Sequence, residues 1–464
     1  MRREPAFAPG DRVAVIGLGV SGSAASLLAR VGGAEVYASD SAAGPRQVAA
    51  AERLRAEGIA AEAGRHDMDR ILESDLVVTS PGVSPFSEVR QAVTAAGIRT
   101  IAEVELAYRR LASRVIAITG TNGKTTTTQL ATHLLKSSGI DAEAVGNVGR
   151  PLSECALAER QPDWVVVELS SFQLADLDSF ESEIGVLLNL SPDHLDRYRH
   201  IDSYYGDKAR LFDRASEDPS WVLNADDPAV LDLAAGASGR RFLFSVGSEV
   251  PVGAWSDPEG ELFARLAEGD SPVRWANAAD IPLIGRHNVS NALGACLAAV
   301  VAGAEPRSLS ASLRSFRGLP HRLQPVAERA GVLWVNDSKA TNVSAAVAAV
   351  NAFDRPIILL LGGRHKGQPY TELAAAARQR ARAVIAFGEA APLIVSELRD
   401  AVETVVVESG LDSAVRAAAD LARTGDVVLL APACSSYDMF PNYLERGRAF
   451  EAAVVGLQPA ESAP

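Results

Sequence analysis

The sequence has 464 residues, of which 47% are hydrophobic, and a formal net charge of −13. This length predicts roughly two to four domains with sizeable cores. The acidic balance argues against general nucleic-acid binding through a basic surface. The three cysteines have no metal or disulfide spacing, no signal peptide is evident, and no apolar run is long enough to span a bilayer. We therefore expect a soluble cytoplasmic protein without membrane insertion.

The first region alternates between strand and helix patterns. Residues 12–16 predict a buried strand, Gly17-Leu-Gly-Val-Ser-Gly22 a glycine-rich turn into a helix, and residues 35–38 and 75–79 two more strands. The glycine spacing, with Asp40 after the second strand, matches a dinucleotide fingerprint that places a phosphate over a helix N-terminus. Close packing of strand against helix is the alternative explanation for the glycines. No second half of a dinucleotide domain follows, so we expect a smaller mononucleotide domain.

A second glycine-rich turn lies in Val115-Ile-Ala-Ile-Thr-Gly-Thr-Asn-Gly-Lys-Thr-Thr-Thr-Thr128. An apolar strand stops at Gly120, and an amphipathic helix begins at Thr125. Such a loop cradles phosphate with backbone N–H groups, while Lys124 reaches the outer phosphates and the Thr125 hydroxyl can bind Mg²⁺. Only two residues separate Gly120 from Gly123, which makes the loop a shortened variant. A glycine-rich hairpin with a chance lysine is disfavoured by the strand before it and the helix after it.

The central region predicts a parallel sheet wound with helices, with strands at residues 114–119, 142–145, 164–168 and 185–189. Glu168 ends a strand, where a carboxylate can hold Mg²⁺. His194 follows the next strand, and Lys208 lies in a predicted helix. Each residue also has an ordinary explanation. Glu168 could be a solvated acid at a strand end, His194 a helix cap or packing residue, and Lys208 an exposed helix lysine. Residues 234–280 predict an antiparallel extension.

The last region predicts another open α/β sheet, with strands at residues 332–336, 356–361, 383–387, 404–408 and 426–431. Three strand ends carry groups that bind anions, in Asp337-Ser-Lys-Ala-Thr-Asn342, Gly362-Gly-Arg-His-Lys366 and Ala431-Pro-Ala-Cys-Ser-Ser436. Ahead of this region, Gly285-Arg-His-Asn-Val-Ser-Asn291 opens a helix. Asn288 and Asn291 share one of its faces and can either read a base edge or cap the helix.

Together these motifs resemble the Mur ligase family, the ATP-dependent enzymes that form amide bonds in peptidoglycan synthesis. The resemblance covers nearly the whole chain and rests on residues 120–126, 168–174, 189–197, 285–291, 319–322 and 337–342. The last of these stretches favours the branch that adds D-glutamate to UDP-N-acetylmuramoyl-L-alanine. The resemblance implies an α/β fold of three domains. The domains are a Rossmann-like UDP-substrate domain (1–107), a central P-loop mononucleotide-binding domain for ATP (108–317), and a Rossmann-like amino-acid domain (318–464). We expect the chain to be a monomer.

The resemblance also implies roles for individual residues. Those expected at ATP are Gly120, Thr121, Asn122, Gly123, Lys124, Thr125, Thr126, Asn288, Asn291, Arg322 and Asp337. Thr125 and Glu168 are expected to hold one Mg²⁺, and His194 and Lys208, the latter as a carbamate, to serve a second. Lys124, Glu168, His194 and Lys208 are the expected catalytic residues. Substrate contacts are expected from Val20, Ser21, Asp40, Ser41, Ser80, Gly82, Asn147 and His194 for the UDP substrate, and from Lys339, Thr341, Lys366, Ser436 and Tyr443 for D-glutamate.

The implied reaction passes through an acyl phosphate, which the amine of D-glutamate attacks. Three alternatives remain open. Another amide ligase of the same fold, such as a folylpolyglutamate synthase, would lack the UDP-binding first domain. An NAD-dependent oxidoreductase built on the first glycine loop would need a complete dinucleotide domain. A non-catalytic ATP switch would leave Lys208, His194 and the last region's strand-end groups unexplained.

Overall fold

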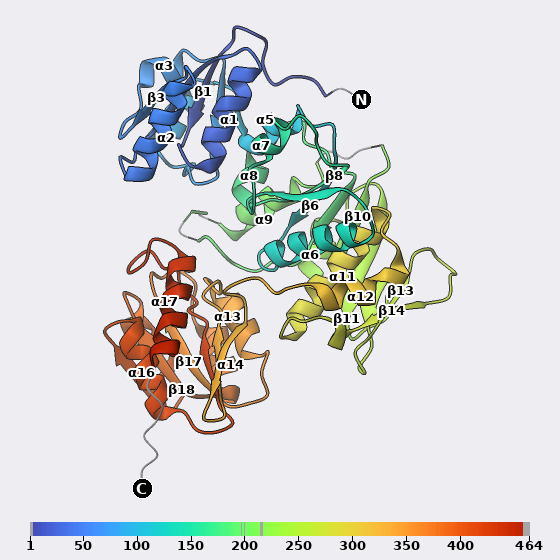
Figure 1. Ribbon diagram of the computed structural model, residues 1–464, viewed down its shortest axis with the longest axis vertical. Helices are drawn as coiled ribbons and strands as arrows, with labels where there is room; N and C mark the ends of the chain where they lie inside the picture. Colours follow the sequence, from blue (N-terminus) through green and yellow to red (C-terminus); the bar gives the residue numbers. More distant parts are fainter. Residues whose placement is uncertain (1–2, 196, 199, 214–216, 458–464) are drawn as a thin grey trace. The chain divides into compact units, whose positions relative to one another are not determined.

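Figure 1 shows the computed structural model, which describes residues 3–195, 197–198, 200–213 and 217–457. Asp196, within one of the motifs above, therefore lies outside the described residues. The chain forms two compact units. The first comprises Met1–Leu190, Arg197–Asp280 and Ser290–Arg314, and the second Ser191–Asp196, Ile281–Val289 and Ser315–Pro464.

The first unit begins with a five-stranded parallel sheet in the order β3-β2-β1-β4-β5. Its strands are β1 (Arg12–Ile16), β2 (Glu35–Asp40), β3 (Ala60–Ala63), β4 (Leu76–Thr79) and β5 (Thr100–Ala102). The helices between and after them are α1 (Val20–Val31), α2 (Pro45–Ala56), α3 (Met68–Leu72), α4 (Glu88–Ala95) and α5 (Glu103–Tyr108). The chain leaves β1 toward β2 on one side and later returns to β4 on the other. This reversal is a topological switch point, where α/β sheets bind ligands at the carboxyl ends of their strands.

A nine-stranded sheet follows in the same unit, in the order β14-β13-β12-β11-β10-β9-β6-β8-β7. Its strands are β6 (Arg114–Thr119), β7 (Ala142–Gly146), β8 (Trp164–Glu168), β9 (Ile184–Leu187), β10 (Ser220–Asn224), β11 (Arg240–Val246), β12 (Gly253–Ser256), β13 (Glu261–Arg265) and β14 (Val273–Asn277). Its helices are α6 (Lys124–Ser137), α7 (Leu152–Ala156), α8 (Ser171–Ala175), α9 (Ile201–Ala209), α10 (Pro228–Leu233), α11 (Arg286–Val301) and α12 (Leu309–Ser315), with 3₁₀ turns η1 (Ala278–Asp280) and η2 (Pro306–Ser308). The first turn of α11 belongs to the second unit.

The central strand β6 lies between β8 and β9, and all three strands are parallel. The order in which strands are added therefore reverses at β6, where the phosphate loop begins. Its interior residues are buried on both faces, as expected for a parallel strand covered by helices. Helix α6 packs on β6, β7 and β8, which fixes the loop between β6 and α6 over the sheet edge.

One sequence expectation needs correction in this unit, and one segment went unpredicted. Residues 234–280 do not form a purely antiparallel extension, because β11 and β12 pair in parallel and only β12, β13 and β14 run antiparallel. The segment ahead of the second sheet, for which no element was predicted, contains the edge strand β5 and helix α5. In both places the pairing partner lies elsewhere in the sheet, so the local residue pattern does not reveal it.

The second unit contains a six-stranded sheet in the order β15-β16-β20-β17-β18-β19, antiparallel only between β15 and β16. Its strands are β15 (Gln324–Arg329), β16 (Val332–Asn336), β17 (Ile357–Gly362), β18 (Ala381–Phe387), β19 (Thr404–Glu408) and β20 (Val427–Leu430). Its helices are α13 (Val343–Val350), α14 (Thr371–Arg380), α15 (Ala391–Leu398), α16 (Leu411–Leu421) and α17 (Tyr443–Gly456). Side chains alternate along β17, with Leu359 and Leu361 in one core cluster and Ile358 and Leu360 in the other. A core on each face explains why β17 is apolar throughout.

The described helices include none that is long and apolar enough to cross a bilayer.

Candidate active site

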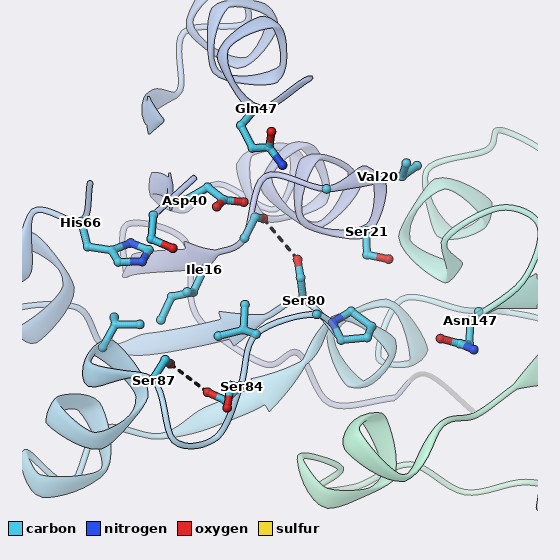
Figure 2. A pocket seen from close by; sticks show the side chains of 18 residues that line it. Ile16, Val20, Ser21, Asp40, Gln47, His66, Ser80, Ser84, Ser87 and Asn147 are labelled. Carbon is cyan, nitrogen blue, oxygen red and sulfur yellow. Dashed lines mark hydrogen bonds between the residues drawn. The ribbon is translucent and has the colours of Figure 1, made fainter. Parts of the chain in front are cut away.

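A cavity of about 640 Å³ opens at the carboxyl ends of β1, β2 and β4 in the first unit. Figure 2 shows its lining, which comes from the ends of these strands and the segments after them, from helices α2 and α4, from the loop after β3 and from the turn after β7. All seven residues expected to contact the UDP substrate, His194 aside, line this cavity: Val20, Ser21, Asp40, Ser41, Ser80, Gly82 and Asn147. Their binding role stays a prediction, but the fold gathers them around one space.

The described lining of the cavity mixes polar and apolar residues and includes no lysine or arginine. Asp40 is held by two backbone N–H groups, because its Oδ2 accepts from Leu18 N at 2.8 Å and its Oδ1 from Ala42 N at 2.8 Å. A ligand phosphate would therefore meet the N-terminus of α1 and neutral donors such as Ser21 and Ser80.

The glycines of the first loop differ in what surrounds them. Gly17 has a φ of +99°, and an added Cβ would lie 2.8 Å from Ser80 Cβ. At Gly22 an added Cβ would lie only 1.8 Å from the carbonyl oxygen of Gly17. Gly19 faces open space, with nothing within 4 Å. The outer two glycines thus serve the packing of strand and helix, and Gly19 leaves room for a ligand above the helix N-terminus.

Sequence reasoning missed four polar residues of the cavity, namely Gln47, His66, Ser84 and Ser87. His66 follows β3, a four-residue strand whose Ala-Ala-Glu-Ala sequence carries little strand signal. Gln47 lies in the first turn of α2, a helix that was not predicted from the sequence. The available signal was the short polar stretch that contains His66, between the strands predicted at residues 35–38 and 75–79.

The phosphate loop connects β6 to α6. Gly120 and Gly123 have φ values of +149° and +83°, and an added Cβ at Gly123 would lie 2.1 Å from Asn291 Oδ1. The turn is held from the side by Asn189, whose Oδ1 accepts from Asn122 N at 2.8 Å and whose Nδ2 donates to Asn122 O at 3.0 Å. The shortened loop is therefore a rigid turn, and Asn291 lies against it rather than apart from it.

Two lysines meet at this loop. Lys124 Nζ donates to Gly120 O at 2.9 Å and to Thr121 O at 2.8 Å. Lys208, from α9, is 1% exposed, and its Nζ donates to the same Gly120 O at 2.9 Å. Tyr204 lies beneath it, with its ring centroid 4.6 Å from Lys208 Nζ and its hydroxyl 3.3 Å from Thr121 Oγ1. The ordinary reading of Lys208 as an exposed helix lysine is therefore wrong.

Glu168, at the end of β8, is buried beside the loop, because it pairs in register with Ile118. Its Oε1 accepts from Asn147 Nδ2 at 2.8 Å. Its Oε2 has no hydrogen-bond partner within the described part of the chain. An orphaned buried carboxylate oxygen is costly unless a cation completes it, so Glu168 fits a Mg²⁺ ligand. Glu168 is the only carboxylate of the predicted first metal site, and the described residues hold no cluster of three His, Cys, Asp or Glu side chains suited to a metal.

In the second unit, Arg322 lies close enough to Asp337 and to His287 to influence both electrostatically. Burial raises the pKa of Asp337 to about 7, although the charge of Arg322 opposes the shift. Burial and the same arginine lower the pKa of His287 to about 4. Asn288 donates from Nδ2 to Ile284 O at 2.8 Å. The structure thus brings together Arg322 and Asp337, two predicted ATP contacts, and adds His287, which sequence reasoning did not single out.

Residues 191–195 also belong to the second unit, where they contact the Asp337–Asn342 motif region. Asp193 accepts from Asn342 Nδ2 at 2.9 Å, and Lys366 Nζ lies 3.5 Å from its Oδ1. Burial raises the pKa of Asp193, but the charges of Lys366 and His194 outweigh it and hold that pKa below the ordinary value. His194 itself has a φ of +55° and places Nε2 3.8 Å from Asp193 Oδ2. Its predicted partner Lys208 belongs to the first unit, and their shared metal site stays a prediction.

The remaining predicted D-glutamate residues surround the strand ends of the third sheet. Lys339 Nζ lies 4.2 Å from the centroid of the Tyr443 ring, and Tyr443 O accepts from Ser338 Oγ at 2.8 Å. Thr341 follows Lys339 in a tight turn, with Thr341 N donating to Lys339 O at 2.7 Å. Ser436 is buried, and its carbonyl accepts from the backbone N–H groups of residues 439 and 440.

An arginine that the sequence analysis missed connects these strand ends. Arg446 is fully buried and donates to Ser338 Oγ at 3.0 Å, Ser338 O at 2.8 Å, Cys434 O at 3.1 Å and Gly362 O at 3.3 Å. Burial lowers its pKa to about 10. Nothing in the sequence of α17 distinguishes Arg446 from a surface arginine.

Comparison with known proteins decides the family. Models of the Mur ligase MurD-like N-terminal domain, the Mur ligase middle domain and the Mur ligase glutamate ligase domain match residues 11–102, 118–299 and 321–434. A protein of Acidobacterium capsulatum named UDP-N-acetylmuramoylalanine–D-glutamate ligase is 42% identical over 97% of each chain. One of the same name from Pelotomaculum thermopropionicum is 38% identical over 96% of this chain and 98% of its own. The chain belongs to the Mur ligase family.

Solved structures of Mur ligases share the fold at low sequence identity. A pseudomurein peptide ligase type C from Methanothermus fervidus has a TM-score of 0.59 at 19% identity and covers 96% of this chain and 100% of its own. The UDP-N-acetylmuramate–alanine ligase of Thermotoga maritima has the same score and identity over 96% and 99%. The α/β fold of N-terminal, middle and C-terminal Mur ligase domains is thereby confirmed, whereas the boundaries at 107/108 and 317/318 stay predictions.

Proposed function

We propose that this Mur ligase uses ATP to join D-glutamate to UDP-N-acetylmuramoyl-L-alanine, forming ADP and phosphate. The curated relatives at 42% and 38% identity carry that activity in their names, and the motifs match along the chain. The observation that carries the proposal is the contact between Asn147 and Glu168. Asn147 lines the cavity of the first sheet, while Glu168 lies beside the phosphate loop. A substrate seated in the cavity would thus present its far end to the phosphate of ATP.

The reaction has two steps. A carboxylate oxygen of the UDP substrate attacks the γ-phosphorus, and the bond to the β–γ bridging oxygen breaks to release ADP. The amine nitrogen of D-glutamate then attacks the acyl carbon, the amine loses a proton, and phosphate leaves. Charge moves on the phosphoryl oxygens in the first step, so a fixed cation beside them lowers its barrier. Lys124 is the residue proposed for this task.

Glu168 and Thr125 are proposed to hold a Mg²⁺ ion, since the buried Oε2 of Glu168 needs a cation and Thr125 lies in the first turn of α6 beside the loop. When bound, such an ion neutralises phosphate charge. A second ion is proposed to involve Lys208 and His194.

Carbamylation of Lys208 is proposed from its surroundings. Its Nζ is buried, and it shares the Gly120 carbonyl with the Nζ of Lys124. Burial and a neighbouring ammonium both favour the neutral amine. The neutral nitrogen can bond to the carbon of CO₂ and lose a proton, which leaves an anionic carbamate. That group offers the hard oxygen ligands that Mg²⁺ prefers.

The second unit supports an amino acid with two carboxylates. Lys339 and Lys366 are the only lysines of the second unit, and both follow strand ends of its sheet. Buried Arg446 fixes the loops around them without a carboxylate partner among the described residues. A dicarboxylate such as D-glutamate would bring two anionic groups to the lysines at these strand ends.

The deciding experiment measures phosphate release from ATP with UDP-N-acetylmuramoyl-L-alanine and single amino acids. D-Glutamate should start turnover, whereas L-glutamate, diaminopimelate and lysine should not. Equal turnover with another amino acid would overturn the substrate assignment. Turnover independent of the UDP substrate would overturn the role of the cavity. We further propose a cytoplasmic monomer, for which sedimentation of the purified chain is the check.

A further inference from the structure

The segment that follows β9 lies between two other strand ends of the nine-stranded sheet. Strand β9 pairs in parallel with β6 on one side and with β10 on the other, so the carboxyl ends of all three strands are neighbours. The phosphate loop follows β6, the β9 segment (residues 188–190) follows β9, and the motif Asn224-Ala-Asp-Asp227 follows β10. Contacts made by that motif can therefore reach the phosphate loop through the β9 segment.

The β9 segment holds the phosphate loop through backbone and side-chain hydrogen bonds. Asn189 O accepts from Thr121 N at 2.9 Å. The Asn189 side chain accepts from Asn122 N at 2.8 Å and donates to Asn122 O at 3.0 Å. The packing is also close, because an added Cβ at Gly120 would lie 3.0 Å from Leu188 Cβ. The position of the β9 segment thus sets the position of the loop.

The motif after β10 holds the β9 segment at both of its ends. Asn224 is buried, and its Nδ2 donates to Leu188 O at 2.8 Å. Asp227 Oδ2 accepts from Leu190 N at 2.7 Å. The other oxygen of Asp227 accepts from Ala229 N at 3.1 Å and caps the N-terminus of α10. The residues directly before and after Asn189 are therefore fixed by two side chains of one motif.

The neighbouring aspartate of the motif bonds in another direction. Asp226 Oδ1 accepts from Ser245 Oγ at 2.6 Å, and its Oδ2 accepts from Val246 N at 2.7 Å. Both partners lie on β11, which is one strand farther from the phosphate loop than β10. Asp226 and Asp227 thus make hydrogen bonds of the same kind, but only those of Asp227 reach the β9 segment.

We propose that Asn224 and Asp227 are positioning residues for the phosphate loop. By holding the two ends of the β9 segment, they keep Asn189 against Asn122, so that the N–H groups of the loop are oriented for phosphate before a nucleotide binds. This inference rests on the proposed role of the loop at ATP. The alternative is that these bonds only stabilise the sheet, in which case their loss would lower the Tm without a specific effect on nucleotide binding.

The test measures the Tm of the purified full-length chain and its binding of ADP with Mg²⁺ by calorimetry. Asp227→Asn keeps an oxygen that can cap α10, but it places an amide where Leu190 N–H needs an acceptor. It should weaken ADP binding about tenfold, the size of one hydrogen bond to a charged group. UDP binding should not change. Asp226→Ala is the matched control, because it loses two hydrogen bonds to β11 and should lower the Tm while ADP binding stays at the wild-type value.

Two further variants test the path through Asn189. Asn224→Asp removes the donor to Leu188 O and should also weaken ADP binding about tenfold, which keeps the test valid if Asp227→Asn does not fold. Asn189→Ala should weaken ADP binding by itself. Adding Asp227→Asn to it should cause little further loss, because the contact with Asn122 is then absent from the start. Fully additive losses would overturn the path through Asn189.

The remaining outcomes separate two failures. If Asp227→Asn and Asn224→Asp both bind ADP as the wild-type chain does, the inference is wrong and the proposed function stands. The inference is also wrong if Asp226→Ala weakens ADP binding as much as Asp227→Asn, since binding would then follow stability alone. If the wild-type chain does not bind ADP with Mg²⁺, the proposed role of the loop fails together with the inference.

Discussion

The two glycine loops of the first unit share an architecture but differ in charge. Each loop follows the strand at which the strand order of its sheet reverses, β1 or β6, and each leads into a helix, α1 or α6. The cavity at the first loop has no lysine or arginine among its described lining residues. At the second loop, the Nζ atoms of Lys124 and Lys208 both lie 2.9 Å from Gly120 O.

This difference in charge matches the different tasks proposed for the two loops, phosphate binding at the first and phosphate transfer at the second. A phosphate that is only held can be satisfied by backbone N–H groups, hydroxyls and a helix N-terminus, because its charge does not change. A phosphate that is transferred gains and loses charge on particular oxygens, and only groups that interact more strongly with the transition state accelerate that step. Cations therefore belong at the second loop and are dispensable at the first.

The largest expected effect comes from removing the cation of the second loop. Lys124→Ala should reduce ATP-dependent phosphate release by about a thousandfold or more, as the loss of a fixed charge beside a reacting phosphoryl group does. UDP binding, measured by calorimetry, should be unchanged. Lys136→Ala, on the exposed end of the same helix, is the control and should retain activity. A Lys124→Ala chain with near-normal turnover would remove the distinction between the two loops.

Lys208→Ala should be nearly as damaging, with turnover reduced about a hundredfold or more, because an oxygen ligand of a catalytic metal contributes several kcal/mol to the transition state. The specific signature of a carbamate is chemical rescue. Short carboxylic acids should partly restore the activity of Lys208→Ala but not that of Lys124→Ala. Depleting bicarbonate should slow the wild-type chain reversibly. Normal turnover of Lys208→Ala would refute the carbamate.

At the first loop the effect should be smaller and confined to binding. Gly19 has extended backbone angles (φ −70°, ψ −174°) and open space around it, so Gly19→Ala should fold without strain. Its methyl group would occupy the approach to the N-terminus of α1 and weaken UDP binding about ten- to a hundredfold, through lost charge-assisted hydrogen bonds. Gly236→Ala, also in open space but outside the cavity lining, is the control. A lower kcat at unchanged KM would contradict a purely binding role.

The sequence predicted most of the fold because buried parallel strands have a strong local pattern. The apolar, β-branched runs of β6, β8 and β16 were located within a residue or two. The missed strands lack that pattern, since β3 is Ala-Ala-Glu-Ala, β5 has three residues, and β15 carries Pro325 and two charged residues. The parallel pairing of β11 with β12 depends on contacts between segments, which no local period encodes.

For the site, the sequence predicted which residue types lie at which strand ends. It could not predict which of these side chains contact one another in the folded chain. Lys208 was predicted on a helix, yet only the fold shows its Nζ at Gly120 O. Asn291 was predicted for adenine, and its contact with Gly123 could not be foreseen. Arg446 was missed because its importance comes from the three strand-end loops that surround it.

The smallest effect concerns helix α5, which lies in the chain between the two sheets that carry the loops. Glu103 is buried there, and its Oε1 accepts from Ser153 N at 2.6 Å. Burial raises the pKa of Glu103 to about 7. Between about pH 4.3, where an unfolded glutamate titrates, and pH 7, the folded chain binds the extra proton. The free energy of unfolding therefore falls as the pH rises through this window and stays at its lower value above it.

Glu103→Gln cannot ionise, so it should flatten this dependence and raise the Tm at pH 8 by about 2–6 °C, with little change near pH 4. Glu105→Gln, two residues along, should do the opposite. Its carboxylate accepts from Asp178 N, Ser179 N and Phe180 N, each at 3.0 Å, and from Arg109 Nε at 2.6 Å, and an amide cannot replace it. If both variants lowered the Tm at pH 8, the ionised carboxylate of Glu103 would stabilise the folded chain, and the unfavourable effect of its burial would be refuted. Because neither residue belongs to a glycine loop, both variants should keep the kcat and KM of the wild-type chain below their melting range. A change in either constant would mean that the two loops are coupled through α5 rather than independent.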